Sequence, residues 1–379
     1  MVQLRHLLIK KQMKLTSIQW ANDTVNPHMG CAGCELFPSA AKFLTAIGNL
    51  LGELGIRINV RGLYSRLINE YYNRIACPQL GHRNALTTTN IWHLRNKFAA
   101  VISRLHGRPA GRRVLEVIEK TLVCYAAKLH LNRGANILEP LRKRNVGYAP
   151  TFEQLTRFPG RMQKAAQWED LRECNDADKP WLKGLPRLIF VSDMGDSFSS
   201  KGQFDYIEKE MAAVSSENGQ RHLWLWLSKR PHHMRSFSER IGGFPPNVCV
   251  MTTLTGPDTL QRVDELRKVN ASSRGLSIEP LWERIPPESL DLTGINWVIV
   301  GGESGSRKAA RPFEVAWAEE LREHCRKHGV AFFLKQLGRN PVEKGKMLQL
   351  KNNHGGDWSE WPKRLRVREF PAYFRQYRG

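Results

Sequence analysis

The sequence predicts an α/β fold built on a parallel sheet, and three observations support this prediction. Between residues 186 and 338, short apolar runs alternate with segments whose apolar residues recur at helical spacing. The runs are apolar throughout, which is typical of strands covered on both faces. Polar residues follow each run, at the strand end where parallel barrels build their active sites. The alternation fits both a (β/α) barrel and an open doubly wound sheet.

About seven strands are expected. The first is TSIQWAND at residues 16–23, which ends in a polar loop. The other six lie in RLIFVSDMGDSF (187–198), HLWLWLSKRP (222–231), NVCVMTTLTG (247–256), SRGLSIEPL (273–281), INWVIVGGESG (295–305) and VAFFLKQLG (330–338). Helices are expected at 204–219, 232–243, 257–269 and 313–329, and Pro257 suits the first turn of the third.

A basic, helical stretch from about residue 40 to 121 separates the first strand from the others. Segments 39–55 and 89–107 place apolar residues at helical spacing, and Thr89 and Asn90 are N-cap candidates for the second. Arginines grip phosphates and aromatics stack on bases, although helical spacing also predicts that many of these aromatics form a buried face. The residues concerned are Arg57, Arg61, Arg66, Arg74, Arg83, Arg95, Lys97, Arg104, Arg108, Arg112 and Arg113, interleaved with Tyr64, Tyr71, Tyr72, Trp92 and Phe98.

The composition points to a polyanionic partner. The 379 residues include 58 Lys and Arg against 36 Asp and Glu, a net charge of +22, while 41% of the residues are apolar, enough for a real core. Nucleic acid is the commonest polyanion that such a charge serves, and a basic surface that serves only solubility is the alternative.

The amino-terminal residues suggest neither a membrane span nor a secretion signal. No run of about 18 apolar residues occurs, and the apolar part of MVQLRHLLIKKQMK is too short for a signal peptide. Residues 1–12 are expected to be a dispensable extension, with Met13 as a second start. A cytoplasmic location follows, in which the seven cysteines are thiols available to a metal.

Half of a metal site is visible in NPHMGCAGCELFPS (26–39), where Cys31 and Cys34 are spaced C-x2-C. Cys249 lies in a strand and Cys325 in a helix, where buried thiols are the better interpretation, and Cys174 has no local partner. Zinc needs four ligands, for which His28 and Cys77 would have to be recruited. Cys77 and Cys124 therefore remain as partners, and chance spacing of the pair is the plain alternative.

Several motifs together resemble a phage-associated family with a three-cysteine motif within the radical S-adenosyl-L-methionine (SAM) superfamily. The resemblance covers most of the expected barrel. It begins with Trp20, Asn26, Pro27, Gly30, Cys31 and Cys34, continues with Cys124-Tyr125-Ala126, and includes FEQLTRFPGRM (152–162), LSKRP (227–231), SIEPL (277–281), WVIVGGESG (297–305) and FFLKQLG (332–338).

The resemblance implies a partial (β/α) TIM-like barrel formed by residues 13–34 and 124–338. In the family the three cysteines lie close together in sequence, so residues 35–123 are interpreted as a helical basic insertion, and 339–379 form a C-terminal tail. Long insertions cost little closure entropy, so a site can survive one. Cys31, Cys34 and Cys124 would hold a [4Fe–4S] cluster, with Cys77 as the rival third ligand.

The resemblance also implies that the open iron of this cluster binds SAM. One-electron reduction, with an electron donor such as flavodoxin or ferredoxin, would then release a 5′-deoxyadenosyl radical. The expected function is a radical SAM enzyme that modifies or repairs DNA or RNA. The alternatives are a radical reaction on a peptide or small molecule, and a non-enzymatic nucleic-acid-binding phage or defence protein whose metal site is structural.

The ends of the later strands supply candidate SAM or substrate ligands. Cations there can bind carboxylates or phosphates, glycines permit close backbone approach, and carboxylates can accept from hydroxyls or amines. The candidates are Ser228, Lys229, Arg230, Glu279, Gly301, Gly302, Glu303, Ser304 and Lys335. A solvated strand end and a salt bridge between Glu279 and Lys335 are the structural alternatives. Asp193 and Asp196 are open to polar contacts or helix capping.

Overall fold

The computed structural model describes residues 16–74, 86–133, 147–149, 152–153 and 155–378. The expected extension, 1–12, lies outside these residues. The chain divides into two compact units, one formed by residues 1–27 and 158–379 and the other by residues 28–157. The predicted insertion, 35–123, falls within the second unit, and so do Cys31, Cys34 and Cys124. We call the first the sheet unit and the second the helical unit.

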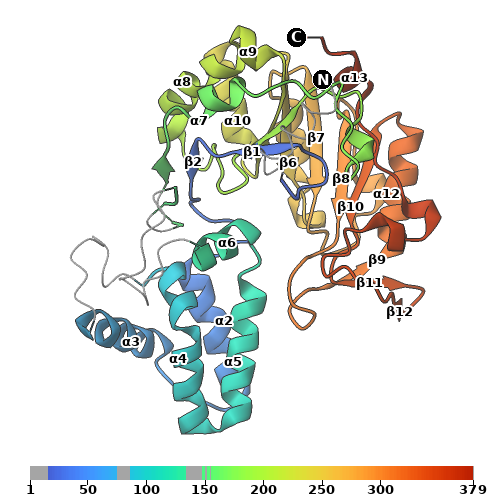
Figure 1. The fold of residues 1–379 in the computed structure, drawn as a ribbon. Helices are drawn as coiled ribbons and strands as arrows, with labels where there is room; N and C mark the ends of the chain where they lie inside the picture. The colour runs from blue at the N-terminus through green and yellow to red at the C-terminus, as the bar shows by residue number, and fades with distance from the viewer. Residues whose placement is uncertain (1–15, 75–85, 134–146, 150–151, 154, 379) are drawn as a thin grey trace. The chain divides into compact units, whose positions relative to one another are not determined.

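The sheet unit is built on seven strands that all run parallel (Figure 1). Their order across the sheet is their order along the chain, and the sheet curls into a half-barrel. A doubly wound sheet would reverse direction at a switch point, so the strand order excludes that alternative. The strands are β1 (Asp23–Val25), β4 (Leu188–Val191), β5 (Leu223–Ser228), β6 (Val248–Thr253), β7 (Ser273–Ile278), β8 (Trp297–Gly301) and β10 (Ala331–Gln336).

The first strand begins later than the sequence indicates. Residues 16–22 form turns, and only β1 pairs with β4, with Asp23 opposite Ile189. Two buried contacts fix this end of the sheet: Arg187 forms an ion pair with Asp23, and the Lys179 ammonium donates to the carbonyl oxygens of Thr16, Ile18 and Ala21, each at 2.7 Å. Segment 16–22 therefore caps the edge of the sheet instead of extending it.

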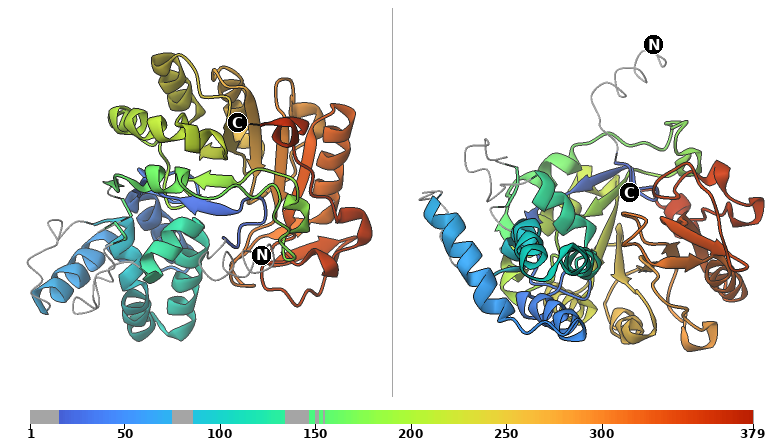
Figure 2. Two further views of the ribbon diagram at one scale, coloured as in Figure 1. Left: turned by 45° about the horizontal axis from the view of Figure 1, so that its top comes forward. Right: turned by 90° about the horizontal axis from the view of Figure 1, so that it is seen from below.

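Helices cover one face of the sheet, as Figure 2 shows. Alternate strand residues such as Val191, Trp226 and Val250 share a buried cluster with the helices, as expected for a sheet apolar on both faces. The helices of this unit are α7 (Arg161–Ala166), α8 (Phe204–Val214), α9 (Glu217–Gln220), α10 (Pro231–Ile241), α11 (Gln261–Arg267) and α12 (Val315–Lys327), with 3-10 turns at Pro180–Leu182, Lys201–Gln203, Pro257–Thr259 and Pro287–Ser289.

The C-terminal tail fills the other face of the sheet. Phe370 and Phe374 join the cluster around Trp297 and Phe333. Val367 and Glu369 hydrogen-bond with β10 and so protect an open edge. The buried Arg368 guanidinium lies 3.9 Å from the Trp181 ring centroid. The tail contains β11 (Asn340–Glu343), β12 (Lys346–Met347), 3-10 turns at Trp358–Glu360 and Lys363–Leu365, and α13 (Ala372–Gln376); β11 also pairs with β9 (Pro312–Glu314).

The helical unit packs α2 (Ala40–Glu53), α3 (Val60–Arg74), α4 (Thr88–His106) and α5 (Arg108–Thr121) around a core, followed by α6 (Tyr125–Arg133). The strands β2 (His28–Met29) and β3 (Thr156–Arg157) pair antiparallel as a short two-stranded sheet. The N-cap of α4 is Thr87, whose hydroxyl accepts from the Asn90 N–H, so the expected caps Thr89 and Asn90 were placed too late. Thr89 is inside the helix and instead binds the Glu153 carboxylate.

Three of the aromatic residues considered for base stacking are core residues of the helical unit. Tyr64 and Phe98 are fully buried and stack with their ring centroids 4.2 Å apart, and Trp92 is buried as well. The side chains of Tyr71 and Tyr72, and the whole of Arg83, lie outside the described residues. Base stacking on Tyr64, Trp92 or Phe98 is therefore excluded in this fold. In the part of the chain that is described, no helix is long and apolar enough to cross a membrane.

Candidate functional site

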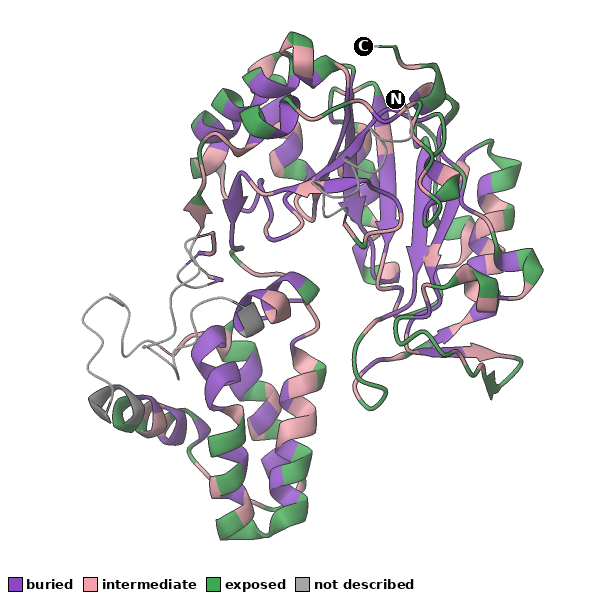
Figure 3. Ribbon diagram, viewed as in Figure 1, coloured by how far each residue is buried: buried purple, intermediate pink, exposed green. Residues whose placement is uncertain are grey.

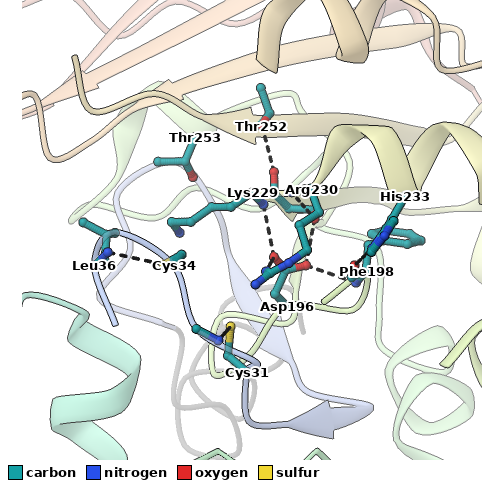
Figure 4. A network of polar contacts seen from close by, with 12 residues as sticks. Cys31, Cys34, Leu36, Asp196, Phe198, Lys229, Arg230, His233, Thr252 and Thr253 are labelled. Carbon is teal, nitrogen blue, oxygen red and sulfur yellow. Dashed lines mark hydrogen bonds and ion pairs between the residues drawn. The ribbon is translucent and has the colours of Figure 1, made fainter. Parts of the chain in front are cut away.

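The first two candidate ligands lie in a tight loop after β2. Gly30 and Gly33 have φ angles of +106° and +104°, which favour glycine, and they turn the chain around Cys31. The Cys31 N–H donates to the Phe152 carbonyl oxygen at 2.8 Å. The Gly33 N–H donates to the Cys31 sulfur at 3.5 Å, and the Leu36 N–H donates to the Cys34 sulfur at 3.4 Å (Figure 4).

Cys124 is joined to this loop through its backbone. The Leu36 carbonyl oxygen accepts from the N–H groups of Val123, at 3.1 Å, and Cys124, at 2.8 Å. Cys124 immediately precedes α6, and its sulfur accepts from the Ala127 N–H at 3.4 Å. The helical insertion therefore returns the chain to the cysteine loop. The rival ligand Cys77 lies outside the described residues.

The three cysteines offer the donors that an iron–sulfur cluster requires. Thiolates are its usual ligands, and N–H···S hydrogen bonds to ligand sulfurs tune such clusters. Each of the three sulfurs already accepts one backbone N–H. Within the described residues, no three His, Cys, Asp or Glu side chains are assembled as a metal-binding group.

The other described cysteines are poor ligands. Cys249 and Cys325 are buried, as expected, and burial raises the pKa of each thiol to about 12. Both thiols therefore remain protonated at neutral pH, whereas a cysteine that binds a metal must be a thiolate. Burial also raises the pKa of Cys174.

A buried histidine supports the cysteine loop. His130, on α6, donates from Nε2 to the Ala149 carbonyl oxygen at 2.8 Å. The same segment supplies the Phe152 carbonyl that holds Cys31, and the Ala149 N–H donates to the Met29 sulfur at 3.4 Å. Burial lowers the pKa of His130, so the ring is neutral at pH 7. His130 thus links the helix after Cys124 to Ala149, whose own N–H contacts Met29 just before the cysteine loop.

In the sheet unit, the predicted polar residues gather at the carboxyl edge of the parallel strands. Asp196 is the centre of one network (Figure 4): its carboxylate accepts from the Ser228 hydroxyl at 2.7 Å, the Lys229 N–H at 3.2 Å and the Arg230 guanidinium at 2.8 Å. Arg230 is therefore held by an internal carboxylate. The Thr252 hydroxyl donates to the Ser228 carbonyl oxygen at 2.8 Å.

Two further ion pairs involve predicted residues. The Lys335 ammonium lies 2.5 Å from the Glu279 carboxylate, so the salt bridge considered as the structural alternative is present. Glu303 is buried and forms an ion pair of 2.9 Å with Arg311, which stacks 4.2 Å from the Trp282 ring centroid. The sequence did not indicate Arg311 or Trp282, because their partners come from other loops.

Close packing explains why glycine occupies the first two positions of GGESG. A Cβ added at Gly302 would lie 2.5 Å from the Leu337 carbonyl oxygen, and one added at Gly338 would lie 2.7 Å from the Gly302 carbonyl carbon. A Cβ at Gly301 would press on the Glu279 side chain at 3.2 Å. Gly301 and Gly302 therefore permit close packing between the ends of β8, β7 and β10. Ser304, the next candidate, is half-buried in the following loop.

Sequence reasoning assigned no individual role to three groups at this edge. Asn26 donates to the Asp193 carboxylate at 2.5 Å and accepts from the Met194 N–H at 2.9 Å, which ties the loop after β1 to the loop after β4. Ser192 has a φ of +67°, a conformation that clusters at functional sites. Among the described residues, the buried Thr253 hydroxyl at the end of β6 lacks a hydrogen-bond partner. The available signals were their positions at strand ends and, for Asn26, its place in the motif that carries the resemblance.

Comparison with known proteins gives one finding. A family model described as Protein of unknown function (DUF5131) matches residues 117–362, which is well over half of the chain. No curated protein and no solved structure matches the chain significantly.

Proposed function

The chain belongs to the family described as Protein of unknown function (DUF5131), and we propose that it is a radical SAM enzyme that acts on nucleic acid. The observation that carries the proposal is the junction of Cys31, Cys34 and Cys124. Each sulfur accepts a backbone N–H, and the Leu36 carbonyl joins the loop of the first two to the third. Three thiolates with a free fourth iron site are the ligand set that this chemistry uses.

Cys31, Cys34 and Cys124 would hold a [4Fe–4S] cluster. A reduced cluster held there would supply the single electron needed for reductive cleavage of the SAM sulfonium C–S bond. The Gly33, Leu36 and Ala127 N–H groups stabilise negative charge on the three sulfurs. The Phe152 carbonyl and the backbone link to Leu36 hold Cys31 and Cys124 in place.

The carboxyl edge of the sheet is the proposed site for SAM and substrate groups. Lys229 and Lys335 suit carboxylates or phosphates, and Glu279 suits hydroxyls or an amine. Asp196 positions Lys229 by accepting from its N–H, and Glu303 is kept in place by Arg311. A curled parallel sheet with polar strand ends supports this assignment, since such edges build active sites in barrels.

Nucleic acid is favoured as substrate by the charge of the chain. The excess of 22 positive charges suits a polyanion, and exposed arginines on the helical unit add to it. An electron donor such as flavodoxin or ferredoxin would supply the reducing electron. A structural metal site in a binding protein is the competing function, because it would use the same cysteines.

The decisive experiment measures 5′-deoxyadenosine. Protein reconstituted with iron and sulfide without oxygen, then reduced with dithionite, should convert SAM to 5′-deoxyadenosine and methionine. Cys34→Ala should abolish the product, whereas Cys325→Ala, which removes a buried thiol outside the site, should retain it. A wild-type protein that holds a full cluster and yields no 5′-deoxyadenosine, with or without DNA or RNA, would establish the structural metal site instead.

A further inference from the structure

The helical unit carries a segment without acidic residues. Between residues 71 and 115 there is no Asp or Glu, while Arg95, Lys97, Arg104, Arg108, Arg112 and Arg113 all lie on α4 or α5. Arg113 approaches Glu53 at 3.9 Å, an exposed pair of little strength. In the described part of the chain, Arg104, Arg108 and Arg112 are exposed and form no ion pair.

An apolar side chain protrudes among these arginines. Leu105 is 61% exposed, the most exposed of the large hydrophobic residues in the described ranges. It lies in the last turn of α4, next to Gly107, whose φ of +88° allows the sharp turn into α5. We call Arg104, Leu105, His106, Arg108 and Arg112 the hairpin tip, which is exposed at the end of the α4 and α5 helices in Figure 3.

The hairpin tip is rigidly supported. A Cβ added at Gly111 would collide with the Ser103 side chain and the Ala99 carbonyl oxygen, so α5 approaches α4 closely just below the tip. Pro109 fixes the first turn of α5, and Val114 and Ile102 are fully buried in the core below. The tip therefore presents its side chains from a fixed scaffold.

Helix stability does not explain this arrangement. Arg108, Arg112 and Arg113 occupy the first turns of α5, where positive charge opposes the helix dipole. Neither helix has an acidic residue in its first turn to compensate. A polyanionic partner would offset the repulsion.

We propose that the hairpin tip binds duplex DNA, with Arg104, Arg108 and Arg112 on the phosphates and Leu105 inserted at a base step. An arginine guanidinium can donate two hydrogen bonds to the oxygens of one phosphate. Apolar side chains such as Leu can insert between adjacent base pairs of bent DNA. A membrane surface is a poorer fit, because membrane-binding helices expose a broad apolar face and the apolar faces of α4 and α5 are buried in the core. The inference rests on nucleic acid as the substrate class proposed above, but the binding needs no cluster.

Binding is measured on the full chain with a fluorescent DNA duplex over a range of salt concentrations. Arg104→Ser/Arg108→Ser/Arg112→Ser should weaken binding at least about tenfold and lower the slope of log K against log salt by about 2–3, since about 0.9 counterions are released per phosphate contact. Arg57→Ser/Arg61→Ser/Arg66→Ser removes the same charge from exposed positions of the same unit and is the matched control. An equal loss in both variants, or no loss in the first, would overturn the proposal.

The role of Leu105 has a separate readout. Leu105→Ser should leave the salt slope unchanged but lower the fluorescence increase of 2-aminopurine, which reports unstacking of a base step. Wild-type protein that binds single-stranded DNA, duplex RNA or anionic phosphatidylserine vesicles more tightly than duplex DNA would contradict the proposal. Cys34→Ala should bind DNA as wild type does, so loss of SAM cleavage and loss of DNA binding are distinguishable.

Discussion

The backbone N–H of Cys124 donates to the carbonyl oxygen of Leu36 across 2.8 Å. The two residues lie at opposite ends of the α2–α5 bundle in sequence, and this bond brings the third cysteine to the loop of the first two. The Val123 N–H donates to the same oxygen, so the junction has two bonds. The ligand set consequently depends on the fold of the insertion.

Cluster content separates the two possible third ligands. Anaerobically reconstituted Cys31→Ala, Cys34→Ala and Cys124→Ala should each lose most of their iron, sulfide and brown absorbance, because removing one of three thiolates opens the site. Cys77→Ala and Cys249→Ala should retain wild-type iron. If Cys77→Ala loses the cluster and Cys124→Ala keeps it, Cys77 is the ligand.

Asp196 positions the loop after β5. Asp196→Asn removes an acceptor from a carboxylate that binds Ser228, Lys229 and Arg230, and we expect the free energy of unfolding to fall by about 1.5–3 kcal/mol, the range for a hydrogen bond to a charged group. Urea denaturation measures it. Asp258→Asn, at an exposed position, should change stability by less than about 0.5 kcal/mol. Equal stability of both variants would show that the network is dispensable.

Gly302 is required for backbone packing. Gly302→Ala places a Cβ against the Leu337 carbonyl, and overpacking of this kind costs about 1–3 kcal/mol of stability. Thermal unfolding without SAM or substrate measures the loss. Gly48→Ala, in α2 with open space around the added Cβ, should be neutral or stabilising by up to about 1 kcal/mol. A Gly302→Ala protein of wild-type stability would leave close approach of a ligand as the reason for the glycine.

His222 makes the stability of the sheet unit fall in acid. Burial lowers its pKa from 6.5 to about 4, so between these values the unfolded chain binds a proton that the folded chain does not. The contribution is complete above pH 6.5 and is lost as the pH falls toward 4, amounting to about 2 kcal/mol between pH 7.5 and pH 5. Urea denaturation at the two pH values should show a smaller loss in His222→Gln by about that amount. His354→Gln, at an exposed position, should keep the wild-type loss.

The predicted α/β fold and seven parallel strands are confirmed, because each strand is encoded in a local apolar run. Strand order along the sheet was left open by the pattern, and it is settled by pairing between segments distant in sequence. The pairing of Asp23 with Ile189 also moves the first strand away from residues 16–22, since turns and a buried ammonium take up those residues. The same limit applies to the N-cap of α4. Thr87, Thr89 and Asn90 are all suitable residue types; the structure identifies Thr87, whose hydroxyl accepts from the Asn90 N–H, whereas Thr89 binds the Glu153 carboxylate.

The sequence by itself determined the types of residue at each strand end, the C-x2-C loop, the basic excess and the presence of an α/β sheet. Only the tertiary structure decided that the Cys124 N–H bonds to the loop of Cys31 and Cys34, that Glu279 pairs with Lys335, and that Leu105 is exposed at the turn between α4 and α5. The physical reason is range. Periodicity and local propensity act over a few residues. These contacts join segments that are far apart in the sequence, and sequence separation does not predict how close two segments lie in the fold.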